Sequence, residues 1–293
     1  MNRLRVHISL ATCFLTLASG CTKHPPAPVA ESHEDLDATV WMRTSGEYYA
    51  AAQQAYSVAR TQLTVALANP NWSALPDQQS EMLLDHRAPR PSETAVIIDL
   101  DETVLDNTLY QVDLIERDDE FDPATWSQWV ASCASTLVPG ANEFIEAAHE
   151  LGVHVFFITN RVHSDEPPTR RNLEQLGLVD PNALDNILSK GERETWSSNK
   201  QSRRAFVARR YRVLLLIGDD LNDFVWAGDS PSASARRQLA ETHADMWGRR
   251  WFLIPNPNYG GWERAVYKFD DGLPRNKKIE AKRSAIEAST NST

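Results

Sequence analysis

Residues 96–107 read V-I-I-D-L-D-E-T-V-L-D-N, an apolar run that ends in two closely spaced carboxylates. The run Val96–Ile98 is apolar at every position, which is typical of a strand buried on both faces in a parallel sheet. Because residues i and i+2 of an extended chain point the same way, we expect Asp99 and Asp101 to face one spot. Two ionised carboxylates repel each other there unless a cation or a proton lies between them. The pair is either a surface feature or a reactive site, and the rest of the chain decides which.

Strands and helices alternate after this stretch. We expect apolar strands at 95–98, 153–158, 186–188 and 213–217, and helices at 141–151, 169–176 and 200–210. This alternation predicts an α/β fold with a doubly wound parallel sheet. Residues 46–68, earlier in the chain, are predicted to form an amphipathic helix from a core-facing stripe of Tyr49, Ala52, Tyr56, Ala59, Leu63 and Leu67.

Polar residues follow three of the predicted strands. Asp99 and Asp101 follow the first, Thr159-Asn160-Arg161 the second, and Asp219 the last, with Asp223 four positions beyond it. Parallel strands present their carboxyl ends at one edge of the sheet, where open α/β folds bind ligands. Several carboxylates without clustered His or Cys favour an oxygen-preferring ion, and Mg²⁺ is the natural candidate. The sequence contains no Walker A motif, no G-x-G-x-x-G and no H-E-x-x-H.

The N-terminus resembles a bacterial lipoprotein signal. Arg3 and Arg5 precede a short apolar stretch that ends in L-A-S-G-Cys21. We expect residues 1–20 to be removed, Cys21 to be lipidated, and the protein to be delivered to the outer membrane. The alternative is an ordinary signal peptide with Cys21 incidental. Residues 21–39 are proline-rich, and we expect them to form a linker. We expect the folded domain at 40–272, with a helical part at 40–90, and a polar, loose tail at 273–293.

The charge of the chain restricts its partners. Loss of Arg3 and Arg5 with the signal moves the formal net charge from −10 to −12, which disfavours binding to a nucleic acid polymer. Cys133 is then the one remaining thiol, so we expect no intrachain disulfide.

Four ordered motifs resemble those of the haloacid dehalogenase (HAD) superfamily: D-L-D-E-T, I-T-N, a later lysine and G-D-D-L-N-D. More narrowly, the chain is similar to bacterial class C acid phosphatases, which are outer-membrane lipoproteins and include 5′-nucleotidases. The narrower resemblance rests on W-x-x-W at 126–129, V-P-G before a helix, I-T-N-R, and I-P-N-P-N-Y-G-G-W-E at 254–263. It covers about residues 40–270 and implies a Rossmann-like core with small helical cap elements.

The resemblance assigns roles to the motif residues. Asp99 would be the nucleophile that forms an aspartyl-phosphate, and Asp101 the general acid and then base. Mg²⁺ would bind the Asp99 carboxylate, the Asp101 backbone carbonyl and Asp219. Thr159 would hydrogen-bond the phosphoryl group.

Two lysines compete for the motif position. Lys190 follows the short predicted strand at 186–188, as the family's lysine does, and we prefer it to Lys200, which opens the next helix. The chosen lysine would stabilise charge on the transferred group. Asp223 would contact the metal through water or orient its neighbours.

Four residues are candidates for substrate binding. The positions of Trp126 and Tyr259 match those where relatives stack an aromatic base; the alternative for Trp126 is a core residue. Asn160 and Arg161 are the other two candidates, and Arg161 could contact phosphate or ribose together with His163, the alternative being that Arg161 and His163 are an exposed loop pair. The sequence thus predicts a Mg²⁺-dependent phosphomonoesterase for nucleoside 5′-monophosphates or other small esters. The alternatives are sugar-phosphate hydrolysis, phosphoryl transfer to an alcohol, and a non-catalytic surface binding protein or adhesin.

Overall fold

The computed structural model describes residues 32–84, 93–179 and 185–290. The expected signal peptide, the Cys21 lipidation site and most of the linker lie outside these residues. Helix α1 (Leu36–Thr44) and the buried His33 show that ordered structure begins inside the stretch that we expected to be linker. No helix in the described ranges combines the length and apolar character needed to cross a bilayer.

A five-stranded parallel sheet forms the centre of the fold and confirms the predicted class. Its strands are β1 (Glu93–Ile98), β4 (His154–Val162), β5 (Ile187–Lys190), β6 (Tyr211–Gly218) and β7 (Trp251–Leu253), in the order β5-β4-β1-β6-β7. In register, Val96 pairs with Val155 of β4 and with Leu215 of β6. β1 is therefore the central strand, which explains why its buried part, Ala95–Ile98, is apolar at every position.

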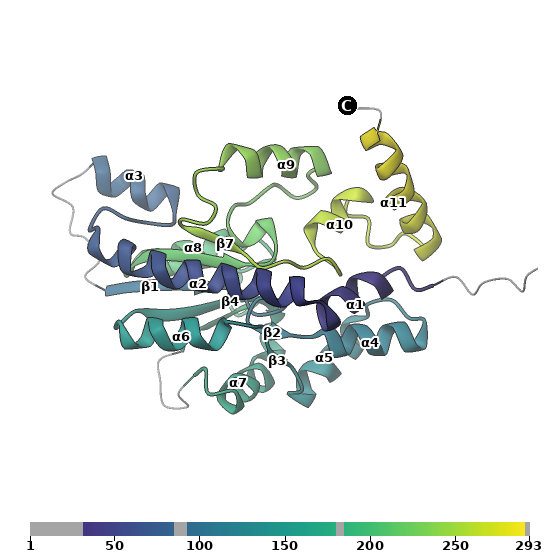
Figure 1. The fold of residues 1–293 in the computed structure, drawn as a ribbon, viewed down its shortest axis with the longest axis horizontal. Coiled ribbons are helices and arrows are strands. Elements are labelled where there is room, and N and C mark those ends of the chain that lie inside the picture. Colours follow the sequence, from purple (N-terminus) through teal and green to yellow (C-terminus); the bar gives the residue numbers. More distant parts are fainter. Residues whose placement is uncertain (1–31, 85–92, 180–184, 291–293) are drawn as a thin grey trace, which may run out of the picture. The chain divides into compact units, whose positions relative to one another are not determined.

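Helices cover both faces of the sheet (Figure 1). Helices α2 (Gly46–Ala68), α6 (Ala141–Glu150) and α7 (Glu166–Gln175) contribute to the core on one face. Helix α8 (Gln201–Ala208) packs on the other face, where Trp196, Trp251 and Phe224 are part of the core. Helix α3 (Pro76–Leu84) follows α2.

Helix α2 coincides with the predicted amphipathic helix, but its buried stripe is offset at both ends. Ser45 caps the helix by accepting a hydrogen bond from the Tyr48 amide. Tyr48 is buried where we predicted Tyr49, and Ala66 where we predicted Leu67. Both stripes span about 18 residues in five turns, so they share the 3.6-residue period and differ only in which of two neighbouring positions faces the core at each end.

A small cap is inserted after β1. Strands β2 (Leu105–Asp106) and β3 (Thr136–Leu137) pair antiparallel and enclose helices α4 (Thr108–Arg117) and α5 (Pro123–Ser132). The hydroxyl of Tyr56 on α2 donates a 2.6 Å hydrogen bond to the carbonyl of Thr103, which ties the start of this insertion to the body of the domain.

The C-terminal part contains helices α9 (Ala233–Thr242), α10 (Gly261–Val266) and α11 (Arg275–Thr290). The prediction of a loose tail is wrong for residues 275–290, because they form a helix held by ion pairs. Arg275 pairs with Glu34 and Asp118, and Lys278 with Glu120. Helix α11 has no hydrophobic stripe, so its sequence does not predict an amphipathic helix. Ion pairs hold it instead.

Candidate active site

The functional residues lie at the carboxyl ends of three adjacent strands. Asp99 follows β1, Thr159 lies near the end of β4, and Asp219 follows β6. The Asp99 amide donates a 2.9 Å hydrogen bond to the carbonyl of Ile217, so β6 holds the backbone of the predicted nucleophile. The Thr103 hydroxyl lies 3.5 Å from Asp99 Oδ2 and 3.4 Å from Asp219 Oδ1. The predicted convergence is present for Asp99 and Asp219, and Thr159 lies on the neighbouring strand β4.

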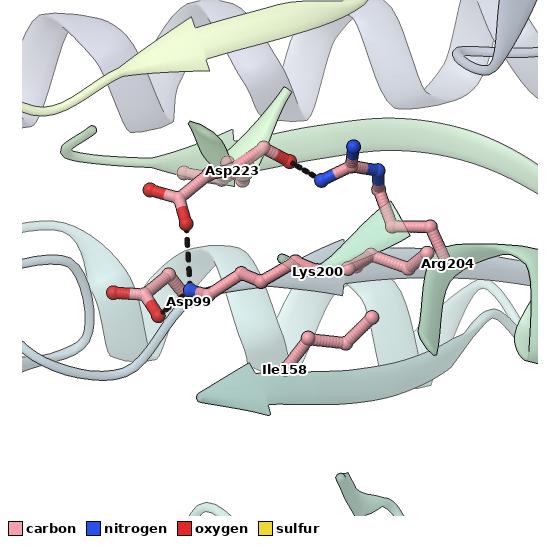
Figure 2. A pocket seen from close by; sticks show the side chains of 7 residues that line it. Asp99, Ile158, Lys200, Arg204 and Asp223 are labelled. Carbon is pink, nitrogen blue, oxygen red and sulfur yellow. Dashed lines mark hydrogen bonds and ion pairs between the residues drawn. The ribbon is translucent and has the colours of Figure 1, made fainter. Parts of the chain in front are cut away.

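Lys200 bridges two of the carboxylates (Figure 2). Its Nζ atom donates hydrogen bonds to Asp99 Oδ1 and, at 2.6 Å, to Asp223 Oδ1. Burial lowers the pKa of Lys200, but Asp223 and Asp99 outweigh burial and raise it overall, so the side chain is a cation. Burial raises the pKa of Asp99, Asp223 and Asp101 raise it further, and Lys200 opposes them.

The geometry corrects the preference for Lys190. Lys190 ends β5, the edge strand, and β4 separates that strand from β1. Neighbouring strands are about 4.8 Å apart, so Lys190 starts two strand spacings away from Asp99. The segment 191–199 turns back on itself through a 2.8 Å hydrogen bond from the Gly191 amide to the Trp196 carbonyl, and Trp196 is buried in the core. Because residues 191–199 fold into this compact turn, Lys200 can reach Asp99 although a long segment separates it from β5.

Three carboxylates form a cluster that fits a divalent cation. Asp99, Asp219 and Asp223 each offer an oxygen, and these atoms all lie within 4.8 Å of one another. Burial raises the pKa of Asp219 well above its usual value, with further contributions from Asp99 and Asp223, while a hydrogen bond from Asn256 lowers it. The Asn256 amide is 2.7 Å from Asp219 Oδ2 and orients that carboxylate. An all-oxygen donor set with excess negative charge is the type that binds Mg²⁺ or a similar hard cation.

Asp223 contributes directly to the cluster. Its Oδ2 accepts a 2.9 Å hydrogen bond from the Asp220 amide, and the two residues form a reciprocal capping box around the short helix η2 (Leu221–Asp223). Arg204 donates to the Asp223 carbonyl at 2.9 Å. A side chain at Gly218 would overlap the Asp223 carboxyl group, which explains the glycine in the G-D-D motif.

Arg161 holds Asp101, which corrects the alternative of an exposed loop residue. Arg161 is only 3% exposed. Its Nε atom lies 3.0 and 3.2 Å from the two carboxyl oxygens of Asp101, and its Nη2 lies 2.7 Å from Oδ1. Asn107 donates to the same oxygen at 3.0 Å and accepts from Trp129 and Ser135. The guanidinium therefore contacts the predicted general acid instead of being free for substrate.

Thr159 and Asn160 are fixed by a residue that the sequence did not reveal. Arg203 is fully buried and donates to the Thr159 carbonyl and, at 2.6 Å, to Asn160 Oδ1. The Asn160 amide donates in turn to the Ser198 carbonyl at 3.2 Å. Burial lowers the pKa of Arg203 to about 10, so it stays a cation at neutral pH. An arginine on the inner face of a predicted helix was the signal that could have identified it.

Trp126 lies in an aromatic group beside Arg161. It packs edge-on to Tyr110, with ring centroids 5.2 Å apart, and the Arg161 guanidinium lies 5.6 Å from its ring centroid. Phe121, which is largely exposed, lies 6.2 Å from the Trp126 ring. Tyr259 is partly exposed in the segment between β7 and α10. Trp126 is half-buried, so part of it can still contact a ligand.

Comparisons with known proteins agree with this geometry. A family model described as "HAD superfamily, subfamily IIIB (Acid phosphatase)" matches residues 23–262. Acid phosphatase 1 of Solanum lycopersicum is 27% identical over 164 residues, which cover 56% of this chain and only 57% of that protein. The class C acid phosphatase from Bacillus anthracis has a TM-score of 0.73 and 27% identity, with 86% of this chain and 96% of that chain covered. A structure of the same enzyme with tungstate bound gives a TM-score of 0.72 and 26% identity, with the same coverage.

Proposed function

Because this chain belongs to the acid phosphatase family of HAD subfamily IIIB, we propose that it hydrolyses phosphate monoesters at the Asp99 site and acts on nucleoside 5′-monophosphates. The observation that carries the proposal is the buried group of Asp99, Lys200, Asp219 and Asp223 at the carboxyl edge of the sheet. It combines a nucleophile, a fixed cation and a set of metal ligands in one place.

Asp99 performs the first chemical step. One of its carboxylate oxygens attacks phosphorus, and the bond between phosphorus and the ester oxygen breaks. Asp101 donates a proton to the departing alkoxide, which leaves as an alcohol. In the second step Asp101 accepts a proton from water as the water attacks phosphorus, and Asp99 and inorganic phosphate are released.

The surrounding residues orient these two acids. Lys200 stays charged beside Asp99 and stabilises negative charge on the transferred group. Arg161 and Asn107 fix the Asp101 carboxyl group through its oxygens. Asp99, Asp219 and Asp223 would hold Mg²⁺, which when bound supplies positive charge to offset the repulsion between a carboxylate nucleophile and a phosphate dianion.

The aromatic group next to Asp101 supports a nucleotide substrate. Trp126 and the exposed Phe121 offer apolar ring surface, and stacking of a base on an aromatic side chain contributes about 1–3 kcal/mol. Arg161 connects this group to the acid, since the same guanidinium contacts both Trp126 and Asp101. A sugar phosphate offers no aromatic ring to stack and would gain less from the same position.

We also propose that the protein is anchored to the outer membrane through a lipid on Cys21. The support is the sequence of residues 1–21, with a basic start, a short apolar stretch and small residues before the cysteine. Radiolabelled palmitate incorporation that is lost in Cys21→Ser would agree with it. Cleavage of the chain with no incorporated lipid would refute it.

The first experiment measures phosphate release from a nucleoside 5′-monophosphate with Mg²⁺, with EDTA, and in Asp99→Asn. We expect activity that EDTA removes, that Mg²⁺ restores, and that is absent in the variant. Asp106→Asn is the matched control, because Asp106 accepts a 2.8 Å hydrogen bond from the Thr108 amide just before α4 and asparagine can keep that bond. No release from a panel of phosphomonoesters would overturn the proposal.

Substrate choice is tested with Trp126→Ala. The variant should lose roughly 10-fold or more in kcat/KM for the nucleotide, which corresponds to the stacking contribution, and little for a sugar phosphate. Equal losses on both substrates would show that Trp126 has a packing role and would remove the support for nucleotides.

A further inference from the structure

Trp129, the second tryptophan of the W-x-x-W pair, lies on helix α5 of the cap and contacts a residue beside Asp101. Its indole nitrogen donates a 2.9 Å hydrogen bond to Asn107 Oδ1. Ser135, from the same inserted segment, donates to this oxygen at 2.6 Å. Asn107 is fully buried, so these donors take the place of water as partners of its side chain. The cap therefore determines how the Asn107 amide group is oriented.

The Asn107 amide group has a defined direction. An indole N–H can only donate, so the atom that faces Trp129 is the Asn107 oxygen, and Nδ2 is left for acceptors. This nitrogen donates at 3.0 Å to Asp101 Oδ1 and at 3.2 Å to the Leu105 carbonyl. The Asn107 backbone is held as well, since its amide donates to the buried Glu102 carboxyl group at 2.9 Å. Asn107 thus links Trp129 to Asp101 in a fixed order of donors and acceptors.

The two carboxyl oxygens of Asp101 differ in their surroundings. Oδ1 accepts from Asn107 Nδ2 at 3.0 Å, and from Arg161 Nε and Nη2 at 3.0 and 2.7 Å. Oδ2 has a longer contact of 3.2 Å with Arg161 Nε. The Asp101 side chain is 18% exposed, so its carboxyl group stays accessible to a ligand. Because N–H donors fill the positions around Oδ1, Oδ2 is the oxygen that can exchange a proton with the leaving group.

We propose that Trp129 is a positioning residue that acts through Asn107 to direct Asp101 Oδ2 toward the leaving group. Helix α5 is itself held at the edge of the sheet, because Ser127 donates a 2.9 Å hydrogen bond to Asp165, just beyond β4. The cap contributes in this way to proton transfer. The inference rests on the proposed phosphatase function and names residues that set its acid step.

The test compares kcat/KM for benzyl phosphate and 4-nitrophenyl phosphate. An alkoxide needs a proton in order to leave, whereas 4-nitrophenolate is a stable anion and leaves without one. Both esters carry one aromatic ring, so a change in ring binding affects both. Trp129→Phe keeps a ring and loses the N–H. We expect it to lower kcat/KM roughly 3- to 10-fold for benzyl phosphate and less than about 2-fold for 4-nitrophenyl phosphate.

A control and a double variant identify the route of the effect. Trp247→Phe also loses an indole N–H, but the partner of that group is the Ala240 carbonyl on α9, so the ratio of the two kcat/KM values should not change. If Trp129 acts through Asn107, adding Trp129→Phe to Asn107→Ala should cause no further loss. Ser135→Ala removes the other donor to Asn107 Oδ1 and should give the same selective loss, which tests the proposal even if Trp129→Phe does not fold.

The outcomes separate this inference from the function on which it rests. Equal losses on both esters in folded Trp129→Phe or Ser135→Ala would assign a packing role and overturn the inference, as would additive losses in the double variant. Hydrolysis of both esters by the unmodified protein with an unchanged ratio in the variants would refute only the role of Trp129. Hydrolysis of neither ester by the unmodified protein would overturn the proposed function and this inference with it.

Discussion

Replacing Lys200 tests whether it, and not Lys190, is the catalytic lysine that we propose. In Lys200→Met the side-chain volume is nearly kept, but Asp99 and Asp223 lose their shared cation. At the 2.6 Å separation of Nζ and Asp223 Oδ1, the attraction is about 6 kcal/mol at an effective dielectric constant of ~20. Desolvation of the buried ions offsets most of it. The part that acts on the transition state should resemble a lost oxyanion donor, about 2.7–4 kcal/mol, or roughly 100- to 1,000-fold in kcat.

The assay is steady-state phosphate release, with Lys190→Met as the matched control. Lys190 ends the edge strand β5, so its replacement should change kcat less than about 3-fold, in the range of an ordinary surface substitution. Thermal unfolding with and without Mg²⁺ checks the fold of each variant, because Lys200→Met leaves three clustered acids whose repulsion a divalent ion relieves. A large loss in Lys190→Met together with near-normal kcat in folded Lys200→Met would refute the assignment.

Two further predictions concern charge elsewhere in the domain. Arg161→Ala should lower kcat roughly 10- to 100-fold, since it removes charge-assisted hydrogen bonds to Asp101. Added guanidinium should restore part of the rate of this variant. Arg161→Lys should have less than wild-type activity, because a lysine cannot bind both carboxyl oxygens of Asp101 as a guanidinium does. No guanidinium rescue would argue for a packing role. Burial, together with the nearby Glu263, raises the pKa of Asp35 from 3.8 to about 6. The folded state therefore holds the Asp35 proton more tightly than the unfolded state does, and the free energy of unfolding falls as the pH rises from about 4 to about 6. Asp35→Asn should therefore raise the free energy of unfolding by up to about 3 kcal/mol at pH 7.5 and change it little at pH 4, as measured by urea unfolding; an equal effect at both pH values would contradict this origin.

The parts of the site that the sequence predicted are those determined by strand ends. Asp99, Thr159 and Asp219 were identifiable because buried parallel strands are continuously apolar and the next polar residue marks the active edge. The choice between Lys190 and Lys200 depended on how residues 191–199 fold, and Trp196 fixes that fold by its burial among residues from other parts of the chain. Arrangements that require a tertiary contact have no local pattern from which they can be predicted.

The same reasoning applies to the arginines and to the C-terminal helix. Arg161 and Arg203 look like surface residues in the sequence, and only the folded chain shows that each is buried against specific oxygens. Helix α11 has no apolar stripe, so its place is set by acidic partners more than 150 residues away in the chain. Long-range ion pairs of this kind leave no periodic signal.

The ion pairs of Arg275 also join three separate parts of the chain. Glu34 precedes α1 and Asp118 ends α4, and both carboxylates pair with the one guanidinium at the start of α11. Removal of residues 275–290 would leave every residue of the Asp99 site in place and would take this partner away from both acids. The loss of the C-terminal helix would therefore be felt first at two remote points of the domain, the approach to α1 and the end of α4, and not in the residues that carry the chemistry.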